Sequence, residues 1–212
     1  MTPSDFQKLT GVSRETLERL ETYDALLKKW QRKINLVGPK TLPDSWERHF
    51  LDSAQIYPLL PENCHTLVDL GSGAGFPGVV LAIMGVPDVH VIESDGRKCA
   101  FMREVIRQTQ APVTVHNKRI EAVENLKADV VTSRALASLN DLVAYAIPFL
   151  KTESVCIFPK GKRTDEELTE ANYLWHIKER RVPSQTDPDG AILLIEGISD
   201  VRETTRQDSN TE

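Results

Sequence analysis

The chain has 212 residues, a formal net charge of −5 and 40% hydrophobic residues, which is typical of a soluble globular protein and argues against a broadly basic nucleic-acid binder. This length predicts one domain with a substantial core. The apolar stretches are shorter than the ~20 residues of a membrane span, and the polar N-terminus lacks a secretory signal pattern. We therefore expect a cytoplasmic protein without a membrane partner.

The three cysteines are widely spaced and form no C-x-x-C pair, so neither a disulfide framework nor a metal site is expected.

Two amphipathic helices are predicted before the first strand. Residues 13–33 carry leucines and Trp30 at near-helical spacing, after the candidate N-cap Ser13. Residues 43–57 place large apolar side chains on one side in the same way. Residues 1–60 are therefore expected to form an N-terminal helical cap that belongs to the same domain as the rest.

From residue 61 to residue 200, apolar strands alternate with helical patterns. The predicted strands are 65–70, 88–93, 113–116, 128–133, 154–159, 175–182 and 190–198, and the predicted helices between them are 76–85, 97–110, 138–150 and 163–173. This alternation predicts an α/β core with a mostly parallel sheet and helices on both faces. Residues 201–212 lack apolar content and are expected to be a disordered tail.

The stretch "DLGSGAGFPG", from Asp69 to Gly78, runs from the end of the first predicted strand into a helix. Glycines at this point of an α/β fold let the backbone approach a ligand beside a helix N-terminus. Read from Gly73, the stretch fits the dinucleotide fingerprint G-x-G-x-x-G. Read from Asp69, it is an acid followed by three alternating glycines, and the two readings predict different cofactors.

The acidic residue Asp69 favours S-adenosylmethionine as the cofactor. A carboxylate at Asp69 would repel a pyrophosphate, but it suits the sulfonium and ammonium groups of S-adenosylmethionine. Glu93 ends the next predicted strand, where a carboxylate accepts hydrogen bonds from the ribose hydroxyls of either cofactor. A nicotinamide-dependent oxidoreductase is the alternative, but it gives Asp69 no role and lacks an obvious Tyr-Lys or His-Asp pair.

Five stretches outside and within the loop resemble one protein family. They are "KKWQRKINLVG" (28–38), "RHFLDS" (48–53), "GFPG" (75–78), "ESDGRKCAFMREV" (93–105) and "SRALASLNDLV" (133–143). In this order they resemble the bacterial ribosomal RNA small subunit methyltransferase G family, also called glucose-inhibited division protein B, from about residue 25 to about residue 163. The resemblance implies a Rossmann-like class I S-adenosylmethionine-dependent methyltransferase with a seven-stranded sheet. It also implies methylation of N7 of one guanine in 16S ribosomal RNA of the small subunit.

The resemblance implies a set of cofactor-binding residues. These are Asp69, Gly71, Gly73, Gly75 and Phe76 in the loop, Glu93 at the ribose, Ile120 and Glu121 at the adenine, and Arg134 beside the transferred methyl group. The guanidinium of Arg134 suits either the methionine carboxylate or an RNA phosphate. A salt bridge to Asp69 or another loop acid is its structural alternative.

Basic residues near the carboxyl edge of the sheet and on the cap are candidates for RNA contact. They are Arg48, His49, Arg97, Lys98, Lys160 and Lys162. Phosphate contacts of this kind position RNA without reading its sequence. The segment before the last strand lacks the basic residues expected of relatives, and the ribose acid is Glu93 where many relatives carry Asp.

The chemistry expected at guanine N7 needs no general base, because N7 carries a lone pair and no proton. Catalysis then reduces to positioning and electrostatics. The chain has "SRAL" where methylation of an exocyclic amine would call for an N/D-P-P-Y-type loop. A non-catalytic RNA-binding assembly factor and a small-molecule methyltransferase remain alternatives, and we expect a monomer.

Overall fold

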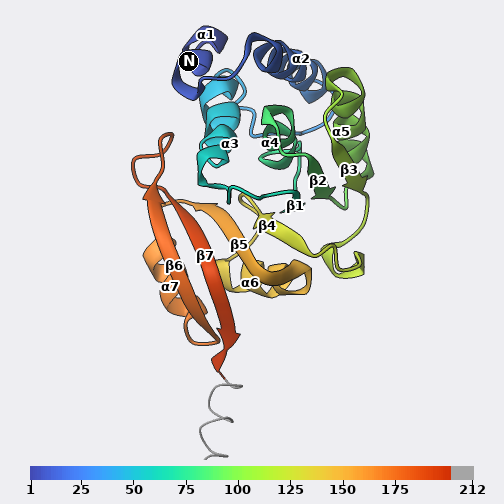
Figure 1. Cartoon of the computed structure of the whole chain (residues 1–212). Helices are drawn as coiled ribbons and strands as arrows, with labels where there is room; N and C mark the ends of the chain where they lie inside the picture. Colours follow the sequence, from blue (N-terminus) through green and yellow to red (C-terminus); the bar gives the residue numbers. More distant parts are fainter. Residues whose placement is uncertain (202–212) are drawn as a thin grey trace, which may run out of the picture.

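The computed structural model describes residues 1–201, so residues 202–212 of the expected disordered tail lie outside the described residues. One sheet of seven strands runs through the molecule in the order β3-β2-β1-β4-β5-β7-β6 (Figure 1). The strands are β1 (Thr66–Leu70), β2 (Asp88–Ile92), β3 (Val113–His116), β4 (Ala128–Thr132), β5 (Leu150–Lys160), β6 (Trp175–Pro183) and β7 (Ala191–Asp200). Strands β1 to β5 are parallel, and β7 pairs antiparallel with both β5 and β6. The expected α/β, mostly parallel sheet is confirmed.

Helices cover both faces of this sheet. Helices α4 (Gly78–Met84) and α5 (Gly96–Thr109) lie on one face, and α6 (Leu139–Ala146) and α7 (Thr164–Ala171) lie on the other. Each face has its own buried apolar cluster, and β1 contributes to both. Leu67 belongs to the first cluster and Val68 to the second, because successive side chains of a strand point to opposite faces. A strand buried on both faces reads as continuously apolar.

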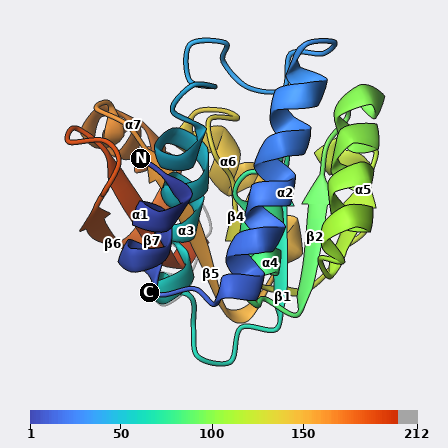
Figure 2. The same ribbon diagram turned by 90° about the horizontal axis from the view of Figure 1, so that it is seen from above.

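The helical cap packs on the α4 and α5 side of the sheet. It comprises α1 (Pro3–Thr10), α2 (Arg14–Gln31), a turn at Trp46–Leu51 and the short helix α3 (Asp52–Ala54). Viewed from above, α2 lies beside α5 (Figure 2), and its apolar side chains share the first cluster with those of α4 and α5. The helix predicted at 13–33 is confirmed as α2. Helix α1 was not expected, because Phe6 is its only buried residue and gives no periodic pattern.

The helix predicted at 43–57 is not one continuous α-helix. Residues Trp46–Leu51 form a wider π-helical turn, α3 continues it, and a 3₁₀ turn follows at Tyr57–Leu59. Apolar spacing over so few turns does not distinguish a period of 3.6 from the wider turn. The difference matters because this segment carries side chains that reach the functional site.

The helix predicted at 138–150 ends earlier, and the following strand begins earlier, than the sequence indicated. Helix α6 ends at Ala146, and a 3₁₀ turn at Ile147–Phe149 leads into β5 at Leu150. Pro148 lies in this turn and has no backbone N–H to donate, so the α-helical pattern stops before it. Within residues 1–201, no helix has the length and apolar character that crossing a membrane requires.

A buried carboxylate joins α2 to the turn that follows it in the cap. Asp24 accepts hydrogen bonds from Ser45 Oγ at 2.7 Å and from Trp46 Nε1 at 3.1 Å, and it pairs with Lys28 at 2.6 Å. The Asp24 residue is only 7% exposed. Its two neutral partners are themselves buried, so they depend on this carboxylate for hydrogen bonding.

Replacing Asp24 with Ala should lower the free energy of unfolding by about 2–3 kcal/mol, because it leaves the Ser45 hydroxyl and the Trp46 indole N–H buried without an acceptor. Urea denaturation measures this change. The exposed Glu21 on the same helix gives the control, and Glu21→Ala should stay within about 0.5 kcal/mol of the parent. Equal stabilities for the two variants would contradict the prediction.

Candidate active site

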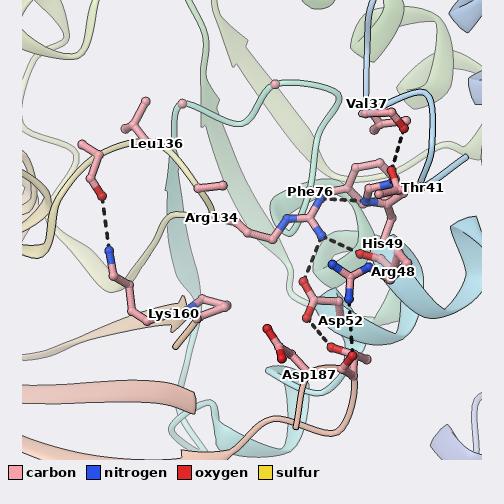
Figure 3. A pocket seen from close by; sticks show the side chains of 18 of the residues that line it. Val37, Thr41, Arg48, His49, Asp52, Phe76, Arg134, Leu136, Lys160 and Asp187 are labelled. Carbon is pink, nitrogen blue, oxygen red and sulfur yellow. Dashed lines mark hydrogen bonds and ion pairs between the residues drawn. The ribbon is translucent and has the colours of Figure 1, made fainter. Parts of the chain in front are cut away.

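A cavity of about 850 Å³ opens where the carboxyl ends of β1 and β4 meet the helical cap (Figure 3). Its walls come mainly from five segments: the glycine loop after β1, the β4–α6 loop, residues 36–52 of the cap region, residues 159–170 at the end of β5 and in α7, and the β6–β7 loop. Lys98 of α5 and Ala191 at the start of β7 complete the lining. A cavity at the carboxyl ends of parallel strands is the usual ligand site of this fold. Among residues 1–201, no group of three or more His, Cys, Asp and Glu side chains is arranged so that it could hold a metal ion.

The glycine loop approaches the cavity in a conformation that other residues rarely adopt. Gly71, Gly73 and Gly75 have φ values of 62°, 58° and 96°. A Cβ atom added to Gly71 would lie 2.5 Å from Leu136 Cδ1, and one added to Gly75 would lie 2.7 Å from a Val79 methyl group. Gly71 and Gly75 are therefore needed for both backbone conformation and space, whereas at Gly73 only the positive φ favours glycine.

Asp69 lies behind this loop. Its carboxylate is fully buried, and it accepts hydrogen bonds from the Gly78 N–H and from Thr132 Oγ1, each at 3.1 Å. Burial raises the pKa of Asp69 to about 6. The carboxylate braces the start of α4 and does not line the cavity, so its contact with a cationic ligand stays a prediction.

A second, smaller cavity of about 130 Å³ lies on the other side of Gly71. It is lined by Glu93, Ile120 and Glu121, the residues expected at the ribose and adenine. Glu93 Oε2 accepts a hydrogen bond from the Gly73 N–H at 3.0 Å. The carboxylate expected at the ribose therefore also holds the glycine loop.

Leu136 lines both cavities and separates them at Gly71. It belongs to the β4–α6 loop, in which the preceding Ala135 has a left-handed φ of 53°, a conformation uncommon for residues other than glycine. Lys160 Nζ holds this loop by donating to the Ala137 carbonyl at 3.2 Å. Leu136 was not among the residues singled out from the sequence, since an isolated Leu carries no sequence signal.

Phe76 forms part of the cavity floor. Its ring stacks on Tyr23 with centroids 5.0 Å apart and on His49 with centroids 5.2 Å apart. The residue is only 3% exposed, so most of its surface packs in the core. The guanidinium carbon of Arg134 lies 5.2 Å from the ring centroid, within the range of a cation–π contact.

The Arg134 side chain is bound to the segment "RHFLDS" of the cap. It forms a salt bridge with Asp52 at 2.9 Å, and it donates to the Arg48 carbonyl and to His49 Nδ1, each at 3.1 Å (Figure 3). The sequence offered a salt bridge to a loop acid as the structural alternative for Arg134. The structure places Asp52 in that position, 82 residues away in the chain.

His49 is largely buried in the wall of the large cavity, and its contact with RNA stays a prediction. Burial, and then the positive charge of Arg134, lowers the pKa of His49 to about 4, so the ring is neutral at neutral pH. Because Nδ1 accepts from Arg134, Nε2 carries the proton, and it donates to Thr41 Oγ1 at 2.8 Å. Neither ring nitrogen remains available as a base.

The remaining candidates for RNA contact fall into two groups. Arg48, Lys98 and Lys160 line the large cavity, whereas Arg97 and Lys162 are exposed outside it. Arg97 pairs with Asp95 at 3.3 Å. The Lys160 side chain is only 8% exposed and pairs with Glu167 at 2.5 Å, so it anchors the β4–α6 loop in this structure. Their contacts with RNA remain predictions.

The sheet order and the glycine loop define the class I, Rossmann-like methyltransferase fold. The crystal structure of M. jannaschii TYW2 in complex with AdoMet aligns with a TM-score of 0.56 at 16% identity, over 80% of each chain. Ribosomal protein L11 methylase from Lactobacillus delbrueckii aligns with a TM-score of 0.55, also at 16% identity, over 70% of this chain and 76% of that one. At such low identity these structures establish the fold alone.

The particular family follows from the sequence comparisons. Residues 16–207 match the model of the rRNA small subunit methyltransferase G family. Proteins named ribosomal RNA small subunit methyltransferase G are 57% identical in Paramagnetospirillum magneticum, over 94% of this chain and 97% of that protein, and 57% identical in Rhodospirillum centenum, over 92% and 91%. The chain belongs to this family of S-adenosylmethionine-dependent enzymes, as the sequence motifs indicated.

Replacing Gly75 with Ala should weaken binding of S-adenosylhomocysteine by more than about tenfold. The new methyl group would lie 2.8 Å from Tyr23 Oη and 2.7 Å from Val79 Cγ2 at a φ of 96°, and such strain displaces the loop. Isothermal titration calorimetry measures the affinity. Gly197→Ala is the control, since a Cβ there meets its nearest neighbour at 3.5 Å. Unchanged affinity for the Gly75 variant would show that the loop does not form the cofactor cradle.

Proposed function

We propose that the protein transfers a methyl group from S-adenosylmethionine to N7 of a guanine in 16S ribosomal RNA of the small subunit. The observation that carries this proposal is the convergence of all five family-like stretches on one cavity. They contribute Leu36, Val37 and Gly38; Arg48, His49 and Asp52; Phe76; Lys98; and Arg134 to Ser138. These residues are far apart in the sequence, so their neighbourhood in the chain does not explain why they line one cavity. Binding of a common ligand does explain it.

The residues present fit S-adenosylmethionine. The backbone of Gly71 to Gly75 would hold the methionine half of the cofactor, and Glu93 would accept hydrogen bonds from the ribose hydroxyls. The small cavity beside Ile120 and Glu121 would take the adenine. Gly71 and Leu136 line both cavities, so the nucleoside and amino-acid halves of the cofactor would lie on either side of these two residues.

The site suits an acceptor that needs no deprotonation. When bound, S-adenosylmethionine supplies a methyl group on a cationic sulfur, and the N7 lone pair of guanine attacks it without losing a proton. His49 is neutral but has both ring nitrogens engaged, by Thr41 and Arg134. The protein then contributes positioning, exclusion of water and the field of its charged groups.

The outer part of the large cavity is available for the target base. The β6–β7 loop lines the cavity with Ser184, Thr186 and Asp187, and Arg48 and Arg163 also line it. This mixture of cations and hydrogen-bonding groups suits a single-stranded nucleotide, whose phosphate and base edges both need partners. We further propose that the protein acts in the cytoplasm as a monomer.

Methyl-labelled S-adenosylmethionine should label 7-methylguanosine in small ribosomal subunits taken from a strain that lacks the gene. The reaction is followed by digesting the RNA to nucleosides and separating them. Subunits from the parent strain, whose target is already methylated, should take up little label. Label in a different nucleoside would contradict the N7 assignment, and binding of the cofactor without transfer would favour the assembly-factor or small-molecule alternative.

Replacing Glu93 with Ala should raise the KM for S-adenosylmethionine by at least about tenfold, because the carboxylate both holds the Gly73 N–H and faces the expected ribose. Steady-state kinetics with varied cofactor measure the effect. Glu121→Ala is the matched control in the same small cavity, where backbone groups are expected to make the adenine contact. Equal effects of the two variants would place the ribose elsewhere.

A further inference from the structure

Three of the five N–H groups of the Arg134 guanidinium have acceptors among residues 1–201. The two Nη1 protons go to Asp52 Oδ2 at 2.9 Å and to the Arg48 carbonyl at 3.1 Å. One Nη2 proton goes to His49 Nδ1 at 3.1 Å. The Nε–H and the second Nη2–H have no acceptor among residues 1–201, and Arg134 lines the large cavity. Two donors of this side chain therefore remain available to a ligand.

The groups that bind Arg134 are themselves held in place. Asp52 Oδ1 accepts from Thr186 Oγ1 at 2.6 Å and from Gln55 Nε2 at 3.0 Å, so both carboxylate oxygens are engaged. Thr186 belongs to the β6–β7 loop. The carboxylate is consequently anchored from the cap and from the far end of the sheet, and it has little freedom to rotate away from Arg134.

His49 is fixed in the same way on the opposite side. Its Nε2–H donates to Thr41 Oγ1 at 2.8 Å, and the Thr41 hydroxyl donates to the Gly38 carbonyl at 2.8 Å. Every donor in this chain of hydrogen bonds meets one acceptor, so the direction of each bond is determined. The His49 ring also stacks on Phe76, which sets the plane of the ring.

We propose that Asp52 and His49 are positioning residues that orient the Arg134 guanidinium so that its two remaining donors bind an anionic oxygen ligand, either the cofactor carboxylate or an RNA phosphate. Side-chain exposures of 19% for Arg134 and 18% for Asp52 mean that both groups are largely desolvated. Such a pair adds little net stability but fixes geometry. Two parallel donors of a guanidinium match a carboxylate or a phosphate in bidentate fashion.

This inference rests on the proposed cofactor, but its test does not depend on the RNA substrate. Binding of S-adenosylhomocysteine is compared with binding of 5′-methylthioadenosine, which lacks the carboxylate, by isothermal titration calorimetry. If Arg134 binds the cofactor carboxylate, Asp52→Asn should weaken S-adenosylhomocysteine binding by about tenfold and leave 5′-methylthioadenosine binding unchanged. If it binds an RNA phosphate, both affinities should stay unchanged, and the KM for small subunits should rise by a similar factor.

A double-mutant cycle tests whether Asp52 acts through Arg134. In an Arg134→Ala background, Asp52→Asn should have less than about a twofold further effect on whichever quantity it changed in the parent. Equal effects in both backgrounds, or equal weakening of the two nucleosides, would overturn the proposal and leave Asp52 with a structural role. No change in either affinity or in the KM for subunits would overturn it as well.

Two further variants distinguish the loss of Arg134 positioning from misfolding of the protein. Thr186→Val removes only the hydroxyl that donates to Asp52 Oδ1, and it should give a smaller loss with the same dependence on Arg134. Glu104→Gln weakens a more exposed ion pair with Arg107 on α5, away from the cavity, and should change none of these quantities. Failure of the parent protein to bind S-adenosylhomocysteine would instead refute the cofactor assignment itself, and with it the proposed function.

Discussion

The backbone path of the glycine loop is fixed by contacts from three separate parts of the chain. The buried Tyr23 hydroxyl of the cap donates to the Ala74 carbonyl, Glu93 at the end of β2 accepts from the Gly73 N–H, and Leu136 of the β4–α6 loop lies against Gly71. Leu136 and Glu93 each line a cavity, and Tyr23 packs against Phe76, which also lines one. Because the glycines carry no side chains, the loop takes its shape from these neighbours, and the geometry of the site depends on all of them at once.

The cap is therefore part of the candidate active site and not a separate module that rests on it. Its apolar side chains share one buried cluster with α4 and α5, while its polar side chains Asp52 and His49 reach the end of β4 through Arg134. Apolar burial supplies most of the stability of such an interface, and hydrogen bonds determine its register. If the cap shifted by a small amount, the hydrogen bonds of Asp52 and His49 would break before the apolar contacts were lost.

Local patterns predicted much of the fold from the sequence. Apolar runs identified the seven strands and the turn signal identified the glycine loop, because both depend on residues that are neighbours in the chain. The pairing of Arg134 with Asp52 could not be predicted, since each of many acids was a possible partner until the fold brought the two together. The same applies to Lys160, which looked like a surface cation and is largely buried against Glu167. The motif placed Asp69 at the glycine loop but did not reveal that its carboxylate is buried and accepts from the Gly78 N–H. Its contact with the cofactor stays a prediction.

The antiparallel insertion of β7 has a consequence for how the entrance to the site is built. Since β7 runs opposite to β5, Ala191 at its beginning lies beside Lys160 at the end of β5, and the hairpin between β6 and β7 is delivered to the same edge of the sheet as the glycine loop. A wholly parallel sheet would carry that connection to the opposite edge. The hairpin thus forms one rim of the large cavity, which it lines with Ser184, Thr186 and Asp187. Its length and side chains can vary without disturbing the strands, but a change at Thr186 would also reach Arg134, because Thr186 holds the Asp52 carboxylate that binds this guanidinium.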